Sequence, residues 1–290
     1  MSIHFIVHGR LAHDLLVRYM RDTYRPAMHV TNYARHASAL ASSLPTDTST
    51  LFVAGGDGTL HEVVHGLMQR APEERPPILL LPLGSGNDTA RMIGARATIA
   101  DVQRRFASRN LLEWDVLECA VGSEGHLRFC TNVLDVGFGG EVARRFNSSL
   151  RRLPARLGYV VATLQSFVRA SPQQMKVVTE RSTHSGDMLL TAIANSKWFG
   201  SGIGIAPHAQ PDDGELDITL VKDVGPLTYL RFLPALMKGV AVQDPRIDYV
   251  RGTTCSVETS KPLPIEIDGE FAGFTPLTVK VHPKAVRLLV

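Results

Sequence analysis

Two short segments combine glycines with acidic or hydroxyl side chains at positions where phosphate chemistry would need them. Gly55-Gly56-Asp57-Gly58-Thr59 follows the apolar run Leu51–Ala54, and Gly84-Ser85-Gly86-Asn87-Asp88 follows the apolar run Ile78–Leu83. Glycines at a strand-to-helix turn let backbone N–H groups approach phosphate oxygens, and the helix N-terminus adds positive potential. We therefore interpret the pair as a phosphate-binding site. The alternatives are a tight turn for the first segment and a helix N-cap by Asn87 or Asp88 for the second.

A different chemistry is indicated by His61-Glu62-Val63-Val64-His65, because H-E-x-x-H on a helix places two imidazoles on one face, as in zinc peptidases. The preceding glycine-rich segment already explains a helix here, and Met68 stands where a metzincin would need glycine. A zinc site is therefore kept only as an alternative. Neither glycine-rich segment is a Walker A loop, which requires G-K-[ST], since no lysine occurs before Lys176.

Two acidic segments lie in the second half of the chain. Asp212-Asp213-Gly214-Glu215-Leu216-Asp217 concentrates carboxylates in a turn, which suits Mg²⁺ or Ca²⁺, and a solvated acidic turn is the alternative. Asp268-Gly269-Glu270 carries a strong hairpin-turn signal, so a plain turn is the alternative to any chemical role.

Five arginines crowd one stretch that also contains Leu150, Leu153 and Leu157, and no acidic residue interrupts them. They are Arg144, Arg145, Arg151, Arg152 and Arg156. Such a segment would be attracted to anionic lipid by about 1 kcal/mol for each charge near the surface. A solvated helix and loop is the alternative.

Secondary-structure elements must hold these side chains in place, and the pattern of apolar residues predicts two kinds of domain. In the first part of the chain, apolar runs alternate with helical patterns, such as Leu60, Val63, Val64 and Leu67 on one face. This alternation predicts an α/β layer with a parallel sheet, and Thr59 with Glu62 has the spacing of a capping box. From about Leu127 short strand-like runs dominate, which predicts a mainly antiparallel β-sandwich.

The strand-like runs of the second part include Leu216–Val221, Leu263–Ile267 and Leu277–Val281. Helical segments interrupt them at Gly158–Arg169 and Leu227–Lys238. We predict a first domain over residues 1–122 and a second over 123–290, with the return of the last strand to the first domain left open.

Composition excludes several classes of protein. The 290 residues are 44% hydrophobic and 20% charged, with a net charge of +3, which is ordinary for a globular chain and too mild to indicate nucleic-acid binding. Cys119, Cys130 and Cys255 form no C-x-x-C pair, so we expect buried free thiols rather than disulfides or a thiolate metal site. No stretch approaches the ~20 apolar residues that cross a bilayer, and no signal peptide is indicated. We therefore expect a cytoplasmic protein.

Taken together in order, the motifs resemble the diacylglycerol kinase catalytic-domain family, which includes bacterial soluble lipid kinases and is related to sphingosine kinases. The resemblance spans almost the whole chain. Its parts are Gly55–Glu62, Pro82–Arg91, Asn132 through Gly139, Asn195, Phe199–Gly202, Ala206-Pro207, Asp212-Asp213-Gly214 and Asp268-Gly269-Glu270.

The resemblance implies an N-terminal Rossmann-like α/β nucleotide domain, a β-sandwich domain for the lipid, and an active site in the cleft between them. It also implies an ATP- and Mg²⁺-dependent lipid kinase that phosphorylates a hydroxyl, as on diacylglycerol. Asp57 would lie near Mg²⁺-bound phosphates, and Glu270 would accept the proton. The remaining nucleotide contacts would be Gly9, Thr31, Gly55, Gly56, Gly58, Thr59, Glu62, Ser85, Asn87 and Asp88. Gln210, Asp213 and Glu215 would match a structural Mg²⁺ site.

The chain departs from the family pattern at two places. His8-Gly9-Arg10 stands where the family has an Asn-Pro-x-x-Gly loop, and His61 and His65 replace common asparagines. NAD kinases also carry Gly-Gly-Asp-Gly-Thr, so a small-molecule kinase of that type is an alternative, as is a non-catalytic nucleotide-binding regulator. As partners we expect a membrane surface contacted peripherally through the arginine segment, with no nucleic acid, and we leave a homodimer open.

Overall fold

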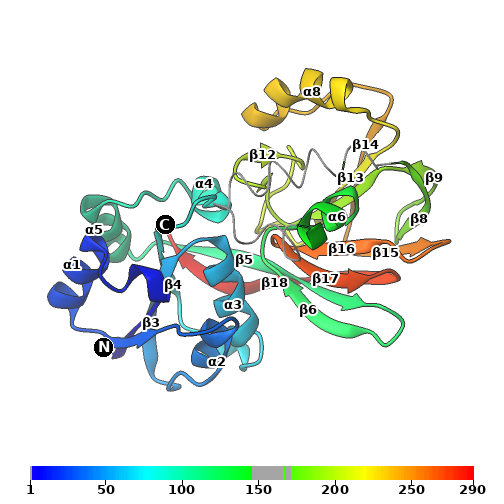
Figure 1. Cartoon of the computed structure of the whole chain (residues 1–290). Coiled ribbons are helices and arrows are strands. Elements are labelled where there is room, and N and C mark those ends of the chain that lie inside the picture. Colours follow the sequence, from blue (N-terminus) through cyan, green and yellow to red (C-terminus); the bar gives the residue numbers. More distant parts are fainter. Residues whose placement is uncertain (1, 146–165, 167–170) are drawn as a thin grey trace. The chain divides into compact units, whose positions relative to one another are not determined.

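The computed structural model describes residues 2–145, 166 and 171–290, and the chain divides into two compact units (Figure 1). The first unit contains Met1–Val116 and Pro283–Val290, and the second contains Leu117–His282. The boundary therefore falls within a strand, at 116/117, and the last eight residues belong to the first unit. The sequence prediction placed the boundary at 122/123.

The first unit is built on a parallel sheet in the order β2-β1-β3-β4, and β18 joins β4 in parallel at Leu288 and Ile78. Its strands are β1 (Ser2–Val7), β2 (Ala27–Val30), β3 (Thr48–Gly55), β4 (Ile78–Pro82) and the end of β18 (Leu277–Leu289). Nearly every residue of β3 and β4 is buried. Their continuous apolar runs are what a parallel sheet covered on both faces requires, and the predicted α/β fold is confirmed.

Helices fill the connections of this sheet. They are α1 (Leu15–Tyr24), α2 (His36–Ser42), α3 (Asp57–Leu67), α4 (Asp88–Ile93) and α5 (Ile99–Ser108), with short 3₁₀ turns at Gly9–Leu11 and Pro72–Glu74. The predicted capping box is wrong, because α3 begins at Asp57 with Gly56 as its N-cap and Thr59 already lies in the first turn. Gly66 packs against α2 so closely that an added Cβ would lie 2.2 Å from the Ser38 carbonyl oxygen.

The second unit contains two antiparallel sheets, in the orders β14-β13-β10-β7-β16-β17 and β6-β5-β18-β15-β8-β9. Buried side chains of both sheets form one core, including Leu134, Ile193 and Ile218 from the first sheet and Val177 and Val257 from the second. The three cysteines are free and buried in this core, as the sequence predicted. A mainly antiparallel β unit is therefore confirmed.

The strands and helices of the second unit have the following bounds. The strands are β5 (Leu111–Val121), β6 (His126–Cys130), β7 (Val133–Gly137), β8 (Gln173–Thr179), β9 (Thr183–Met188), β10 (Leu190–Ala194), β11 (Trp198–Phe199), β12 (Ile203–Gly204), β13 (Leu216–Val221), β14 (Ile247–Gly252), β15 (Thr254–Thr259), β16 (Pro264–Ile267) and β17 (Glu270–Phe274). The helices are α6 (Phe138–Arg145) and α8 (Pro226–Lys238).

The helix predicted at Leu227–Lys238 is confirmed as α8, which packs on the outer face of the first sheet. The helix predicted at Gly158–Arg169 lies outside the described residues, apart from Ser166. Within the described ranges, no helix has the length and apolar character needed to span a membrane.

Candidate functional site

The two glycine-rich loops of the first unit lie in contact with each other. They leave the carboxyl ends of β3 and β4, which are neighbours in the sheet. A Cβ added at Gly84 would lie 2.3 Å from the Gly56 Cα, and a Cβ added at Gly56 would lie 2.9 Å from the Gly84 Cα. Neither position can carry a side chain without displacing backbone, so the glycines are required by the loop-to-loop contact itself.

Asp57 joins these loops through its carboxylate. Its two oxygens accept the backbone N–H groups of Asp88 and Thr89, each at 3.0 Å, so Asp57 caps the N-terminus of α4. Asn87 is the N-cap residue of α4, as the alternative predicted, but its side chain forms no capping hydrogen bond to that helix. Each carboxylate oxygen of Asp57 retains a second lone pair, so the capping role leaves capacity for a further donor or a cation.

Asn87 shapes the second loop. It adopts a left-handed backbone with φ 56°, and its Oδ1 accepts the N–H of Gly84 at 3.0 Å. Its Nδ2 donates to the carbonyl oxygens of Pro82 and Gly84 at 3.2 and 2.8 Å. Ser85 is exposed at the tip of this loop, whereas Asp88 is buried with Oδ1 3.7 Å from the Arg91 Nε.

Gly9 and Thr31 follow β1 and β2 and are hydrogen-bonded to each other. The N–H of Gly9 donates to the Thr31 Oγ1 at 3.1 Å, and a Cβ on Gly9 would lie 2.4 Å from the Thr31 carbonyl oxygen. Because all four strands are parallel, the residues that follow them emerge at the same edge of the sheet. The predicted nucleotide contacts of the first unit are thus gathered at one edge, with Glu62 as an exception.

Glu62 has a structural role, because it caps the start of helix α2. Its carboxylate accepts the N–H groups of Arg35 at 2.8 Å and Ala37 at 3.1 Å, at the start of α2. A carboxylate is favourable there because the first N–H groups of a helix lack intrahelical acceptors. His61 and His65 have ring centroids 6.4 Å apart, and the described residues contain no cluster of three or more His, Cys, Asp or Glu that could hold a metal ion. The zinc alternative therefore has no support in the geometry.

The second unit presents Glu270 beside a clamped turn. Asp268 and Gly269, with φ 48° and 90°, form the turn between β16 and β17. The Asp268 carboxylate accepts the N–H groups of Thr131 at 2.7 Å and Asn132 at 2.9 Å, which fixes the turn to the start of β7. Glu270 is exposed, and its carboxylate has no hydrogen bond or ion pair within the part of the chain described.

A buried pair of carboxyl groups lies next to this turn, and sequence reasoning missed it. Asp135 and Glu266 are cross-strand neighbours on β7 and β16, 0% and 5% exposed. Burial raises the pKa of Asp135 to about 6, and burial together with the neighbouring Asp135 raises the pKa of Glu266 well above its usual value. Gly140 donates its N–H to Asp135 at 2.8 Å, and Gly269 donates its own to Glu266. The available signal was one acidic residue inside each of two apolar strands.

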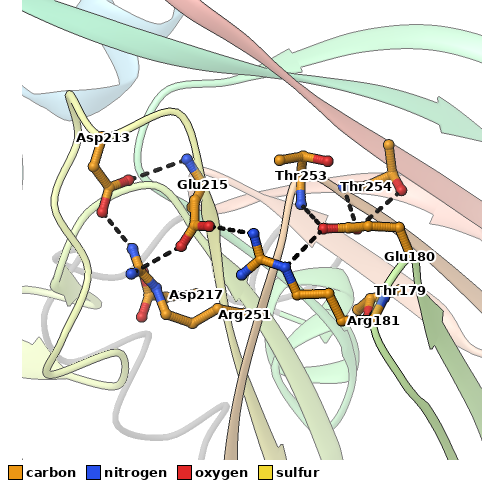
Figure 2. A network of polar contacts seen from close by, with 9 residues as sticks. All are labelled: Thr179, Glu180, Arg181, Asp213, Glu215, Asp217, Arg251, Thr253 and Thr254. Carbon is orange, nitrogen blue, oxygen red and sulfur yellow. Dashed lines mark hydrogen bonds and ion pairs between the residues drawn. The ribbon is translucent and has the colours of Figure 1, made fainter.

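The acidic turn before β13 is bound by guanidinium groups (Figure 2). Arg251 lies opposite Asp217 in the β13–β14 ladder and contacts three carboxylates: Asp213, Glu215 at 2.8 Å and Asp217 at 3.4 Å. Arg181 adds a contact to Glu215 at 2.5 Å. Hydrogen bonding to Arg181 lowers the pKa of Glu215, which keeps that carboxylate ionised.

These contacts bear on the Mg²⁺ that the resemblance assigns to Gln210, Asp213 and Glu215. Both oxygens of Glu215 contact a guanidinium, and the second oxygen of Asp213 accepts the N–H of Glu215 at 3.0 Å. The side chains as they lie do not fit a bound Mg²⁺, because guanidinium groups and a backbone N–H hold the oxygens that it would need. The assignment of the ion to these three residues stays a prediction from the resemblance.

The arginine segment is only partly described. Arg144 is exposed and pairs with Glu141 on α6 at 2.8 Å, and Arg145 closes that helix. Arg151, Arg152 and Arg156 lie outside the described residues.

Both units match models of known protein families. Residues 9–119 match the diacylglycerol kinase catalytic domain, and residues 132–290 match the YegS C-terminal NAD kinase beta sandwich-like domain. The chain belongs to the family of diacylglycerol kinases and YegS-like lipid kinases. Its relatives are named as kinases, which supports a phosphotransferase.

Relatives from several bacteria extend over most of the chain. The diacylglycerol kinase of Bacillus subtilis is 24% identical over 265 residues, covering 91% of this chain and 85% of its own. A "Probable lipid kinase YegS-like" of Shewanella frigidimarina is 26% identical over 255 residues, covering 87% and 79%.

Among solved structures, a diacylglycerol kinase from Bacillus anthracis has a TM-score of 0.73 at 17% identity, covering 99% of this chain and 96% of its own. An NAD kinase from Archaeoglobus fulgidus in complex with ATP has a TM-score of 0.56 at 11% identity, covering 100% and 94%. These two structural likenesses show the fold alone.

Proposed function

We propose that this chain is an ATP-dependent kinase that phosphorylates the hydroxyl of a lipid such as diacylglycerol. The observation that carries the proposal is the contact between the two glycine-rich loops, with Asp57 bound to the start of α4. It makes the edge beyond β3 and β4 a continuous stretch of backbone on which a chain of phosphates can lie. Membership of the diacylglycerol kinase family supports the reaction class and the acceptor.

In this proposal the phosphates bind at the start of α3. The first N–H groups of a helix have no acceptor within it, and the absence of side chains at Gly56 and Gly58 leaves the backbone accessible. Asp57 would supply negative charge for the Mg²⁺ that enters with the nucleotide. When bound, that ion would neutralise phosphate charge.

We assign the acceptance of the hydroxyl proton to Glu270. The Asp268 clamp fixes the turn that precedes Glu270, and its exposed carboxylate is not committed to a structural contact in the described chain. A positioned general base typically contributes on the order of 100- to 10,000-fold in rate.

The test uses radiolabelled ATP with Mg²⁺ and dioleoylglycerol in mixed micelles, and mass spectrometry identifies the product. Glu270→Gln should lower turnover by roughly 100-fold or more while ATP binding is retained. Glu258→Gln is the matched control, since Glu258 is an exposed glutamate of the same unit that pairs with Lys176.

Three outcomes would contradict parts of the proposal. Normal turnover in Glu270→Gln would remove Glu270 from the mechanism. Phosphorylation of NAD⁺ without phosphorylation of lipid would favour the NAD-kinase alternative. ATP binding without any phosphorylated product from a lipid extract would favour a non-catalytic regulator.

A further inference from the structure

Helix α8 has two apolar faces, of which only one is covered by protein. Its inner face places Phe232 and Leu236, both at least 93% buried, in the core on the outer side of the first sheet of the second unit. Tyr229 and Ala235 pack beside them. This inner face accounts for the attachment of the helix, which Figure 1 shows at the periphery of its unit.

The outer face of α8 remains apolar although it is exposed. Leu227, Leu230 and Met237 are 83%, 58% and 64% exposed, and Val240 just beyond the helix is 55% exposed. Positions 227, 230 and 237, with the exposed Pro234, follow the i, i+3, i+7, i+10 spacing of a single helical face. Isolated exposed apolar residues are ordinary, but a row of four along one helix marks a surface that binds something apolar.

The charges of α8 have one sign. The helix contains Arg231 and Lys238 and no acidic residue, and both cations are exposed. In the ranges that the structure describes, neither forms an ion pair or a hydrogen bond. Nearby, Asp223 is exposed, whereas the carboxylate of Asp244 is held by Arg246 at 2.7 Å and interacts only at longer range with Arg231.

We propose that the outer face of α8 docks on the surface of a bilayer that contains anionic lipid. The apolar side chains enter the boundary between headgroups and acyl chains, while Arg231 and Lys238 contact headgroup phosphates. This inference rests on the proposed lipid kinase function, because a diacylglycerol acceptor resides in a membrane. It assigns the membrane contact to a surface other than the arginine segment predicted from the sequence.

The same charges disfavour a second copy of the chain as the occupant. A two-fold symmetric contact through α8 would place a cationic helix against its own copy, with no acidic residue on either helix to compensate. An anionic bilayer matches both the apolar row and the sign of the charge.

The docking test measures co-sedimentation with vesicles of phosphatidylcholine, with and without phosphatidylglycerol. The wild type should bind the anionic vesicles. The double variant Leu230→Glu/Met237→Glu should lower the partition coefficient roughly ten-fold or more. Leu15→Glu is the matched control, since Leu15 begins α1 and is 80% exposed, and its partition should be unchanged.

A charge variant and an activity measurement separate this inference from the proposed function. Arg231→Gln/Lys238→Gln should lower binding to anionic vesicles roughly five-fold for each charge and leave the weak binding to neutral vesicles unchanged. Variants of the outer face should retain turnover of a water-soluble short-chain diacylglycerol and lose turnover of acceptor embedded in vesicles.

Undiminished vesicle binding by the glutamate double variant overturns the docking proposal and leaves the kinase proposal intact. A wild type that binds vesicles but phosphorylates no diacylglycerol of any chain length overturns the kinase proposal instead. If the wild type does not bind vesicles but forms a dimer on gel filtration, and substitutions on α8 dissociate that dimer, the outer face of α8 binds a second copy of the chain and not a membrane.

Discussion

Replacing Arg251 by methionine should destabilise the second unit and make it responsive to Mg²⁺. Methionine retains much of the side-chain length and removes the cation that contacts Asp213, Glu215 and Asp217. In the variant, three neighbouring carboxylates, two in the turn and one on β13, lose their shared counter-charge. A divalent cation can then bind them, so Mg²⁺ should restore stability to the variant and have little effect on the wild type through this site.

The expected loss of stability follows from how exposed the paired side chains are to solvent. The side chain of Arg251 is 41% exposed, so solvent screens its contacts with the acidic turn, and each such pair contributes only about 0–1 kcal/mol. Asp217 is the exception, because it is 6% exposed and burial already raises its pKa. Leaving that carboxylate without its cation costs more than an exposed pair. We expect a total of about 1–3 kcal/mol, or a decrease in Tm of roughly 3–10 °C.

Calorimetry in low salt, with either EDTA or millimolar Mg²⁺, measures both effects. Arg246→Met is the matched control: Arg246 pairs with one carboxylate, Asp244, in the same unit, so its Tm should fall less and should not respond to Mg²⁺. A wild-type Tm that rises with Mg²⁺ while the Tm of Arg251→Met does not would refute the reasoning. That result would mean that a metal binds beside the guanidinium and depends on it.

Two further predictions concern buried charge. Arg105 is fully buried in the first unit, where it binds Asp101 at 2.8 Å and the carbonyl oxygen of Leu80 at 2.8 Å. Arg105→Ala should therefore lower the free energy of unfolding, measured in urea, by about 3 kcal/mol or more. Arg104→Ala removes an exposed partner of the same Asp101 and should cost much less, so equal losses in the two variants would contradict this account. Because burial raises the pKa of Glu266, the folded chain binds more protons than the unfolded chain, so this residue contributes stability at low pH that is lost as the pH rises. Glu266→Gln cannot lose a proton, so its free energy of unfolding should improve relative to that of the wild type as the pH rises from about 5 to 8. A difference that stays constant across that range would show that Glu266 does not titrate differently on folding.

The sequence by itself determined the two kinds of architecture and the existence of the glycine-rich loops. Continuous apolar runs such as Ile78–Leu83 require a sheet covered on both faces, and alternating helical patterns require parallel crossovers. The Asp268-Gly269 pair likewise determined its hairpin turn, because the left-handed backbone that it adopts is a local preference. These features depend on residues that are neighbours along the chain.

The tertiary structure alone decided what each carboxylate binds. Asp57 caps α4, Glu62 caps α2, and Asp213 is bound by Arg251, which lies 38 residues further along the chain. A carboxylate is stabilised by whichever donors the fold brings within about 3 Å, and such donors come from distant segments that no local pattern identifies. For the same reason, the periodicity of α8 predicted a helix, but only the packed structure showed which of its apolar faces meets the core and which is left exposed.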